Sequence, residues 1–227
     1  MISENLNRIY KRISDAAYRS GRNPDKIKLV AVTKTVDIEK INEAINWGVT
    51  AIGENRVQEL IKKYPLVNKK VEWHLIGHLQ TNKVKYIVDK VDLIHSVDSI
   101  KLMEEVNKRA KDIGRIMDIL IEVNISGEAT KYGIKPEDLF DFLKEVPKYS
   151  NIRVKGLMTI APICADPEET RPYFKDMKRL FDEASKLEIQ NVNMVYLSMG
   201  MSNDFEIAIE EGANIIRIGT AIFGQRL

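Results

Sequence analysis

Short apolar segments alternate with longer amphipathic segments from residue 28 to the end of the chain. The short segments are rich in Val, Ile and Leu, and several are almost continuously apolar, which is typical of parallel strands buried on both faces. They cover residues 28–34, 50–54, 72–77, 92–96, 116–124, 153–160, 193–198 and 214–219. The pattern therefore predicts eight parallel strands.

The segments between the predicted strands carry the sequence features of helix ends. Each of the three clearest segments begins with a residue that suits an N-cap and ends at a glycine. These segments run from Asp37 to Gly48, from Ser99 to Gly114, and from Ser202 to Gly212. Residues 1–21 predict a further amphipathic helix ahead of the first strand.

Eight strands that alternate with seven helices predict an α/β fold, a single (β/α)8 TIM barrel with an extra N-terminal helix. An open doubly wound sheet is the structural alternative, although such sheets usually have about five or six strands. The 227 residues of the chain fall within the roughly 200–250 residues that one such barrel needs. Since no linker interrupts the pattern, we expect one domain over residues 1–227.

The charge balance argues against a general attraction to nucleic acid or to anionic membranes. The chain has 35 basic and 33 acidic residues, so its net charge is only +2. Two small basic clusters occur, one of Lys108, Arg109 and Lys111 and one of Lys69 and Lys70. We interpret both as solvated surface rather than as nucleic-acid contacts.

The cysteine content and the lack of long apolar segments indicate where the protein resides. The single cysteine, Cys164, excludes an internal disulfide and favours a reducing compartment. No segment approaches the roughly 18 apolar residues of a membrane span, and the N-terminus lacks the apolar core of a signal peptide. We therefore expect a cytoplasmic protein without a membrane partner.

Chemically able side chains gather where the predicted strands end, which is where barrels of this class carry their active sites. Lys34 ends the apolar strand VAVTK. Partial desolvation of a lysine there disfavours its charged form, and a neutral amine can condense with a carbonyl group. The alternative is a lysine that simply extends from the strand end into solvent.

The last two predicted strands are followed by features of a phosphate site. Gly200 and Ser202 follow the seventh strand, with Ser202 predicted to cap a helix, and Gly219 and Thr220 follow the eighth. These two loops frequently bind phosphate in this fold, through backbone N–H groups, hydroxyls and a helix N-terminus. The alternative is that the glycines only form turns.

A lysine that can attack a carbonyl, facing a phosphate site, fits either pyridoxal 5′-phosphate or the substrate of a sugar-phosphate aldolase. Arg217 favours the first, because it lies two residues before Gly219 and so faces the same side of the strand. An arginine there could meet the nitrogen of the cofactor ring. Because arginine only donates hydrogen bonds, the pyridine would stay neutral and withdraw electrons weakly. A purely structural arginine is the alternative.

The three histidines do not form a recognisable metal site. His74 and His78 are four residues apart, but they lie in a strand and the loop after it, where this spacing does not direct both rings at one ion. No HExxH motif or second cysteine is present. We predict no bound metal, and we expect His74 to line the pocket and His95 to be packed or in a loop.

The ordered set of motifs resembles the pyridoxal phosphate homeostasis protein family, also called the proline synthase co-transcribed family. The matching segments are AVTKT (31–35), IGENRVQEL (52–60), WHLIGHLQTNK (73–83), IHSVDS (94–99), VNISGEATKYG (123–133), VKGLMTIAP (154–162), LSMGMSNDFEIAI (197–209) and IRIGTAIFG (216–224). The fold of this family is similar to the N-terminal barrel of alanine racemase. The set covers nearly the whole chain and is far more specific than any one motif.

The resemblance implies a covalent cofactor, pyridoxal 5′-phosphate, bound as a Schiff base to Lys34, with Arg217 at its ring nitrogen. By the same resemblance, the phosphate would be held by Ser202, Gly219 and Thr220, and the pocket would also be lined by Asn55, His74, Met158 and Ser198. Leu75 stands where the family usually has an aromatic residue, which would alter packing alone. Lys131 matches a family motif whose implied role is regulatory or in cofactor handling.

Two functional interpretations remain: a regulator or carrier of pyridoxal phosphate in vitamin B6 homeostasis, and an amino-acid racemase or related enzyme. The sequence favours the first, because the chain ends at Leu227 without the second domain of alanine racemases. Racemisation also needs an acid or base on each face of the substrate, and only Lys34 is evident. We expect a monomer without robust turnover, whose partners would include apo forms of pyridoxal phosphate enzymes.

Overall fold

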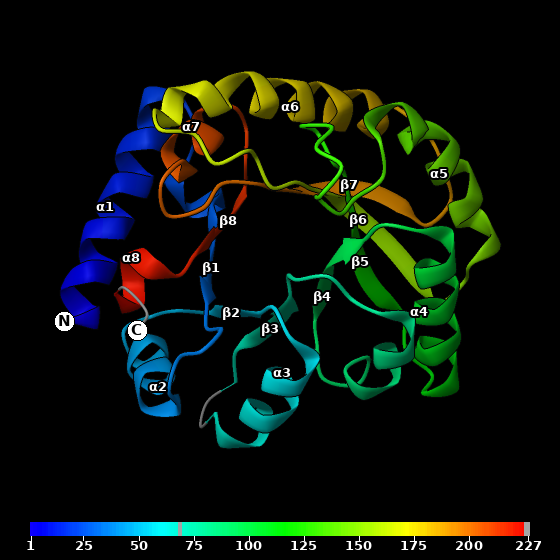
Figure 1. Ribbon diagram of the computed structural model, residues 1–227, viewed down its shortest axis with the longest axis horizontal. Coiled ribbons are helices and arrows are strands. Elements are labelled where there is room, and N and C mark those ends of the chain that lie inside the picture. The colour runs from blue at the N-terminus through cyan, green and yellow to red at the C-terminus, as the bar shows by residue number, and fades with distance from the viewer. Residues whose placement is uncertain (68–69, 225–227) are drawn as a thin grey trace.

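The computed structural model describes residues 1–67 and 70–224, and in it eight parallel strands close into a barrel in sequence order (Figure 1). The strands are β1 (Lys28–Val32), β2 (Ala51–Glu54), β3 (Glu72–Leu75), β4 (Leu93–Val97), β5 (Met117–Glu122), β6 (Ile152–Met158), β7 (Val192–Ser198) and β8 (Ile215–Ile218). The pairing of β8 with β1 closes the sheet on itself. The predicted barrel is confirmed, and the open sheet is excluded.

Helices surround the barrel on its outer side (Figure 1). They are α1 (Ile2–Arg19), α2 (Ile38–Asn46), α3 (Val57–Lys63), α4 (Ile100–Asp112), α5 (Leu139–Glu145), α6 (Arg171–Ser185), α7 (Phe205–Glu210) and α8 (Thr220–Phe223). The extra N-terminal helix is confirmed, and α1 packs against α7 and α8. Between β3 and β4 the structure has a short 3-10 helix, η3 (Thr81–Tyr86), in place of an α-helix.

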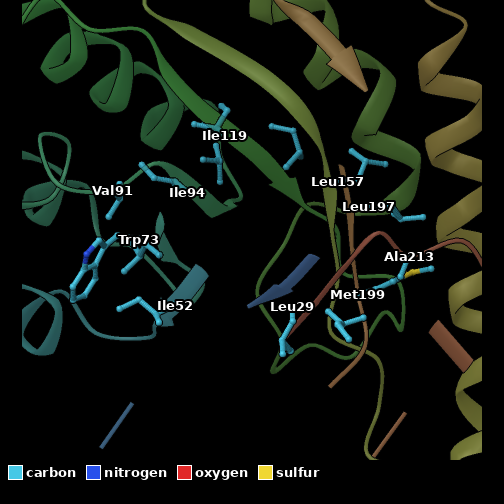
Figure 2. Packing of buried hydrophobic residues seen from close by; sticks show 14 of the residues in the cluster. Leu29, Ile52, Trp73, Val91, Ile94, Ile119, Leu157, Leu197, Met199 and Ala213 are labelled. Atoms are coloured by element: carbon cyan, nitrogen blue, oxygen red, sulfur yellow. The ribbon is translucent and has the colours of Figure 1, made fainter. Parts of the chain in front are cut away.

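Two apolar cores result from the alternation of side chains along the strands. Leu29, Ile52 and Ile119 point outward and pack beneath the helices (Figure 2). Val30 and Leu120, their sequence neighbours, point inward and belong to a second cluster. Nearly continuous apolar strands are therefore needed, because both faces of the sheet are covered.

The predicted helix caps are confirmed only in part. Ser99 caps α4, since its hydroxyl accepts the N–H of Leu102 at 3.3 Å. Ser202 does not cap α7, which begins at Phe205 with Asp204 at the N-cap position. The reason is that Oδ1 of Asp204 accepts the N–H of Met201 at 2.6 Å, which closes a turn where the sequence predicts the first turn of the helix.

The basic cluster on α4 lies at the surface, where Arg109 pairs with Glu105 at 2.6 Å. Lys70 is exposed, and Lys69 lies outside the described residues. No helix within residues 1–67 and 70–224 is both long enough and apolar enough to cross a membrane.

Candidate functional site

A cavity of about 450 Å³ lies at the carboxyl ends of β1 and β8 and beside the loops after β6 and β7. Its volume falls within the roughly 300–1,000 Å³ typical of sites for small molecules. Five of the predicted site residues line it together: Lys34, Ser202, Arg217, Gly219 and Thr220. The structure therefore brings the predicted amine, the predicted phosphate loops and the predicted arginine to one site.

Lys34 lies on a tight turn, whereas the sequence predicts that it ends the strand. β1 ends at Val32, and Thr35 then has a φ of 58°, in the left-handed region that β-branched residues rarely adopt. This conformation turns the chain away from the barrel directly after Lys34, whose side chain is half-buried on the cavity wall.

Three charged residues on the adjacent strand and helix hold this turn. The ammonium of Lys63 donates to the carbonyl of Thr33 at 2.7 Å, to Oε1 of Glu54 at 2.8 Å and to Oε2 of Glu59 at 3.0 Å. The same Glu59 oxygen accepts the N–H of Thr35 at 2.7 Å. We call Glu54, Glu59 and Lys63 the turn clamp, because together they bind the residues on both sides of Lys34.

The ionisation of the turn clamp is shaped by burial. Glu54 is fully buried, and desolvation raises its pKa although hydrogen bonds from Lys63 and Thr33 oppose the rise. At Glu59 desolvation also acts to raise the pKa, but the Thr35 N–H and Lys63 outweigh it and lower the pKa. This cluster was missed from the sequence, although the four-residue spacing of Glu59 and Lys63 on one helix is a detectable signal.

The loops after β7 and β8 form the wall predicted to bind phosphate. Gly200 has a φ of +92°, and a Cβ there would lie 2.6 Å from Cβ of Ala208, so only glycine fits. The hydroxyl of Ser202 accepts the N–H of Ala221 at 3.4 Å and so links the two loops. Gly219 is at the N-cap position of α8 and Thr220 is exposed beside it. Ser202, Gly219 and Thr220 thus line the cavity together.

Asp204 is the one carboxylate on this wall among the described residues. It is buried, and desolvation raises its pKa, while the N–H of Met201 and the charge of Arg217 oppose the rise. Because Oδ1 already accepts a backbone N–H, this side chain also serves the loop structure.

Arg217 presents a fixed cation at the base of the cavity. Its side chain is only 3% exposed, and it donates from Nη1 to Oγ of Ser198 at 2.5 Å and from Nη2 to the carbonyl of Thr159 at 2.8 Å. Burial lowers the pKa of Arg217 to about 10, against the opposing charges of Glu122 and Asp204. The guanidinium therefore remains charged at neutral pH.

The other four predicted site residues do not line the cavity. His74 and Ser198 are buried inside the barrel beneath it, and Met158 belongs to the inward apolar cluster. His95, expected to be packed or in a loop, is packed inside the barrel on β4. Asn55 follows β2, and its Oδ1 is buried without a hydrogen-bond partner in the described structure.

Glu122, which no sequence motif indicates, points inward at the end of β5. Its Oε2 is buried without a hydrogen-bond partner in the described part of the chain. Burial and the nearby charge of Asp98 raise the pKa of Glu122 to about 7. The alternation from Leu120, which points inward, was the available signal.

The residues present fit a small phosphorylated carbonyl compound. The amine, the guanidinium and the hydroxyls of the cavity are donors that match an anionic ligand with an aldehyde. Within the described residues, no group of three or more His, Cys, Asp or Glu side chains is arranged to hold a metal ion.

Comparison with solved structures shows where this architecture occurs. The chain superposes on PipY of Synechococcus elongatus, solved with pyridoxal phosphate bound, with a TM-score of 0.85 and 34% identity, covering 99% of this chain and 100% of that one. An alanine racemase from Clostridium difficile shares the fold, with a TM-score of 0.74 and 17% identity. The match covers 99% of this chain and 56% of that one.

Sequence comparison agrees with the structural one. The pyridoxal phosphate homeostasis protein of Aquifex aeolicus is 50% identical over 227 residues, which cover 98% of this chain and 97% of that relative. The Escherichia coli protein of the same name is 36% identical over 229 residues, covering 99% and 97%. The family model for the alanine racemase N-terminal domain matches residues 5–227. The chain therefore belongs to the alanine racemase N-terminal domain family and, within it, to the pyridoxal phosphate homeostasis proteins.

Proposed function

We propose that this protein binds pyridoxal 5′-phosphate as a Schiff base on Lys34 and serves in its intracellular homeostasis without robust catalytic turnover. The observation that carries the proposal is the placement of Lys34, Arg217 and the two phosphate loops on one cavity. The names of the close relatives and the solved complex of PipY with the cofactor support it.

Each residue has a distinct part in this proposal. The amine of Lys34 condenses with the aldehyde, while Ser202, Gly219 and Thr220 bind the phosphate through hydroxyl and backbone donors. Arg217 donates toward the ring nitrogen. Bound pyridoxal phosphate supplies an electron sink, and a neutral ring beside a permanent cation makes that sink weak.

Among the described residues, the cavity also lacks a well-placed second acid or base, which favours a carrier over a racemase. Besides Lys34 and Arg217, the titratable groups that line it are Asp204 and Cys164. Asp204 is engaged by the N–H of Met201. Desolvation and nearby acidic groups raise the pKa of the Cys164 thiol, so it stays protonated at neutral pH.

A racemase is the second candidate, favoured by the shared fold with alanine racemase. The purified holoprotein would be assayed for loss of optical activity of single amino acids. Turnover above about 1 s⁻¹, within the usual enzyme range, would favour the enzyme. A rate well below this value supports the carrier.

The proposal predicts a visible absorption band that depends on Lys34. With added pyridoxal phosphate, Lys34→Ala loses this band, because Lys34 is the one lysine among the described residues that lines the cavity. Circular dichroism checks that the barrel remains folded. Lys40→Ala, a change of an exposed lysine on the next helix, is the matched control and keeps the band. An unchanged band in Lys34→Ala would remove this residue from the proposal.

The proposal extends to the setting in which the cofactor is held. We infer a cytoplasmic monomer that releases pyridoxal phosphate to apo forms of enzymes that require it. Gel filtration tests the monomeric state, for which the apparent molecular mass should be that of one chain, 26.0 kDa. Restoration of activity to an apoenzyme by the loaded protein, at a rate above that given by its spontaneously released cofactor, tests the delivery.

A further inference from the structure

Five side chains form a continuous series of hydrogen bonds through the interior of the barrel. Oε2 of Glu72 lies 3.1 Å from Nε2 of His74, and Nδ1 of His74 lies 2.9 Å from Nε2 of His95. Nδ1 of His95 lies 3.0 Å from Oγ of Ser198, which accepts Nη1 of Arg217 at 2.5 Å. We call these five residues the interior chain. It joins four strands: β3, β4, β7 and β8.

The interior chain connects the two ends of the barrel. Glu72 begins β3 at the amino end, where its side chain is 44% exposed and pairs with Lys28 at 2.5 Å. Arg217 lies at the opposite end, at the base of the cavity. The three residues between them are buried, with exposures of 1% or less. Buried polar groups are costly unless they are satisfied, and here each ring nitrogen and the hydroxyl has a hydrogen-bond partner within the series.

The protonation of Glu72 fixes the first hydrogen bond. Hydrogen bonds from His74 and Lys28 lower the pKa of Glu72 to about 2, against the effect of burial. The carboxylate is therefore ionised at neutral pH and can only accept hydrogen bonds. It follows that the proton of His74 lies on Nε2.

The remaining hydrogen bonds then have one possible direction. Burial lowers the pKa of His74 and, more strongly, that of His95, so both rings are neutral and carry one N–H each. Nδ1 of His74 must accept, so the proton of His95 lies on Nε2. Nδ1 of His95 must in turn accept from the hydroxyl of Ser198. Only the oxygen of Ser198 then faces Arg217.

We propose that Glu72, His74 and His95 are positioning residues that act through Ser198 to fix the orientation of the Arg217 guanidinium. This inference rests on the proposed function, in which that guanidinium meets the cofactor ring. Because the hydroxyl of Ser198 donates its proton to His95, its oxygen can only accept a hydrogen bond from Arg217. Aligned hydrogen bonds also polarise one another, which strengthens the acceptor.

The arrangement has the order of groups found in serine hydrolases, with one extra histidine between the serine and the carboxylate. A nucleophilic role for Ser198 is excluded by its surroundings. The residue is fully buried, it does not line the cavity, and its oxygen already accepts from Arg217. The series therefore orients a cation and does not activate a nucleophile.

The first test needs no cofactor. The sequence contains only three histidines, and His78, which stacks on Tyr132 at 3.8 Å, lies outside the interior chain and is an internal reference. NMR of ring-¹⁵N histidine in the apoprotein should find His74 and His95 neutral, both with the proton on Nε2, at neutral pH. A proton on Nδ1 of either ring, or a cationic ring, would overturn the proposal.

The second test removes the charge that sets the direction. Glu72→Gln offers a donor as well as an acceptor, so the rings should change to a mixture of tautomers in the same spectra. Bound pyridoxal phosphate should then shift its absorption maximum and bind about tenfold more weakly. His78→Gln is the matched control and leaves the signals of His74 and His95 in place. Unchanged tautomers and an unchanged cofactor spectrum in Glu72→Gln would refute the positioning role.

The two tests separate this inference from the proposed function. If pyridoxal phosphate fails to bind Lys34 in the unaltered protein, the proposed function fails while the tautomers in the apoprotein can still be as predicted. If the cofactor binds Lys34 but the tautomers differ from those predicted, the inference fails alone.

Discussion

Lys63 is a residue whose removal should lower the stability of the barrel. Its ammonium forms an ion pair at 2.8 Å with Glu54, which is fully buried. Lys63→Met leaves that carboxylate uncompensated, which typically costs about 3–5 kcal/mol. We expect a loss of unfolding free energy of this order in urea denaturation of the apoprotein.

The matched control for Lys63→Met is the same substitution at the neighbouring lysine on α3. Lys62 is exposed, and Lys62→Met should change the unfolding free energy by no more than about 0.5 kcal/mol. Equal effects of the two substitutions would mean that the turn clamp contributes nothing to stability.

Glu122 makes the stability of the apoprotein depend on pH. Its pKa is raised from 4.5 to about 7, mainly by burial, so between these values the folded state holds a proton that the unfolded state has lost. The stability contributed by this proton is present below about pH 4.5 and is lost as the pH rises through about 7. Glu122→Gln keeps a neutral group at every pH. Its free energy of unfolding, relative to that of the unaltered protein, should therefore increase by about 2–3 kcal/mol as the pH rises from about 5 to about 8. Urea denaturation of the two proteins at pH 5 and at pH 8 measures this change. The same difference in unfolding free energy at both pH values would contradict the prediction.

At the scale of elements, Gly156 allows β6 and β7 to approach each other. The register between these strands shifts between Val154 and Gly156. Gly156 has a φ of +149°, and a Cβ there would lie 1.8 Å from the carbonyl oxygen of Tyr196. Gly156→Ala should therefore separate the strands and lower the unfolding free energy by more than about 3 kcal/mol.

Gly114 supplies the control, because it has a φ of +65° but, apart from its own atoms and those of its two chain neighbours, no atom of the described residues lies within 4 Å of the position that a Cβ would take. Gly114→Ala should cost only the strain of the backbone conformation, about 1 kcal/mol. The comparison is made by thermal unfolding of the two apoproteins. A loss in Gly156→Ala no larger than that in Gly114→Ala would refute the close approach of the strands.

The elements themselves were largely predictable, and the departures have local causes. Each predicted strand overlaps an observed one, because a sheet covered on both faces requires continuous apolar segments. The predicted start of α7 is two residues too early, since Asp204 competes with Ser202 through its own turn with Met201. The end of β1 was also placed too late, because the left-handed conformation of Thr35 leaves no mark in the sequence.

At the scale of the whole molecule, the barrel separates a cavity at one end from the partly exposed Glu72 at the other. Five of the predicted site residues line the cavity, because motifs at strand ends converge in a closed barrel. It placed His74 and Ser198 at the pocket, whereas both lie beneath it. Contacts between distant strands, such as that of His95 with Ser198, depend on the closure of the barrel. No pattern along the sequence therefore predicts these contacts.

The attachment of the cofactor to Lys34 can be measured directly. Incubation with pyridoxal phosphate, reduction with borohydride and proteolysis would fix any Schiff base as a stable phosphopyridoxyl group, which mass spectrometry assigns to one peptide. The predicted result is a single modified site at Lys34, in the segment that follows β1. Modification of a different lysine, or of none, would contradict it.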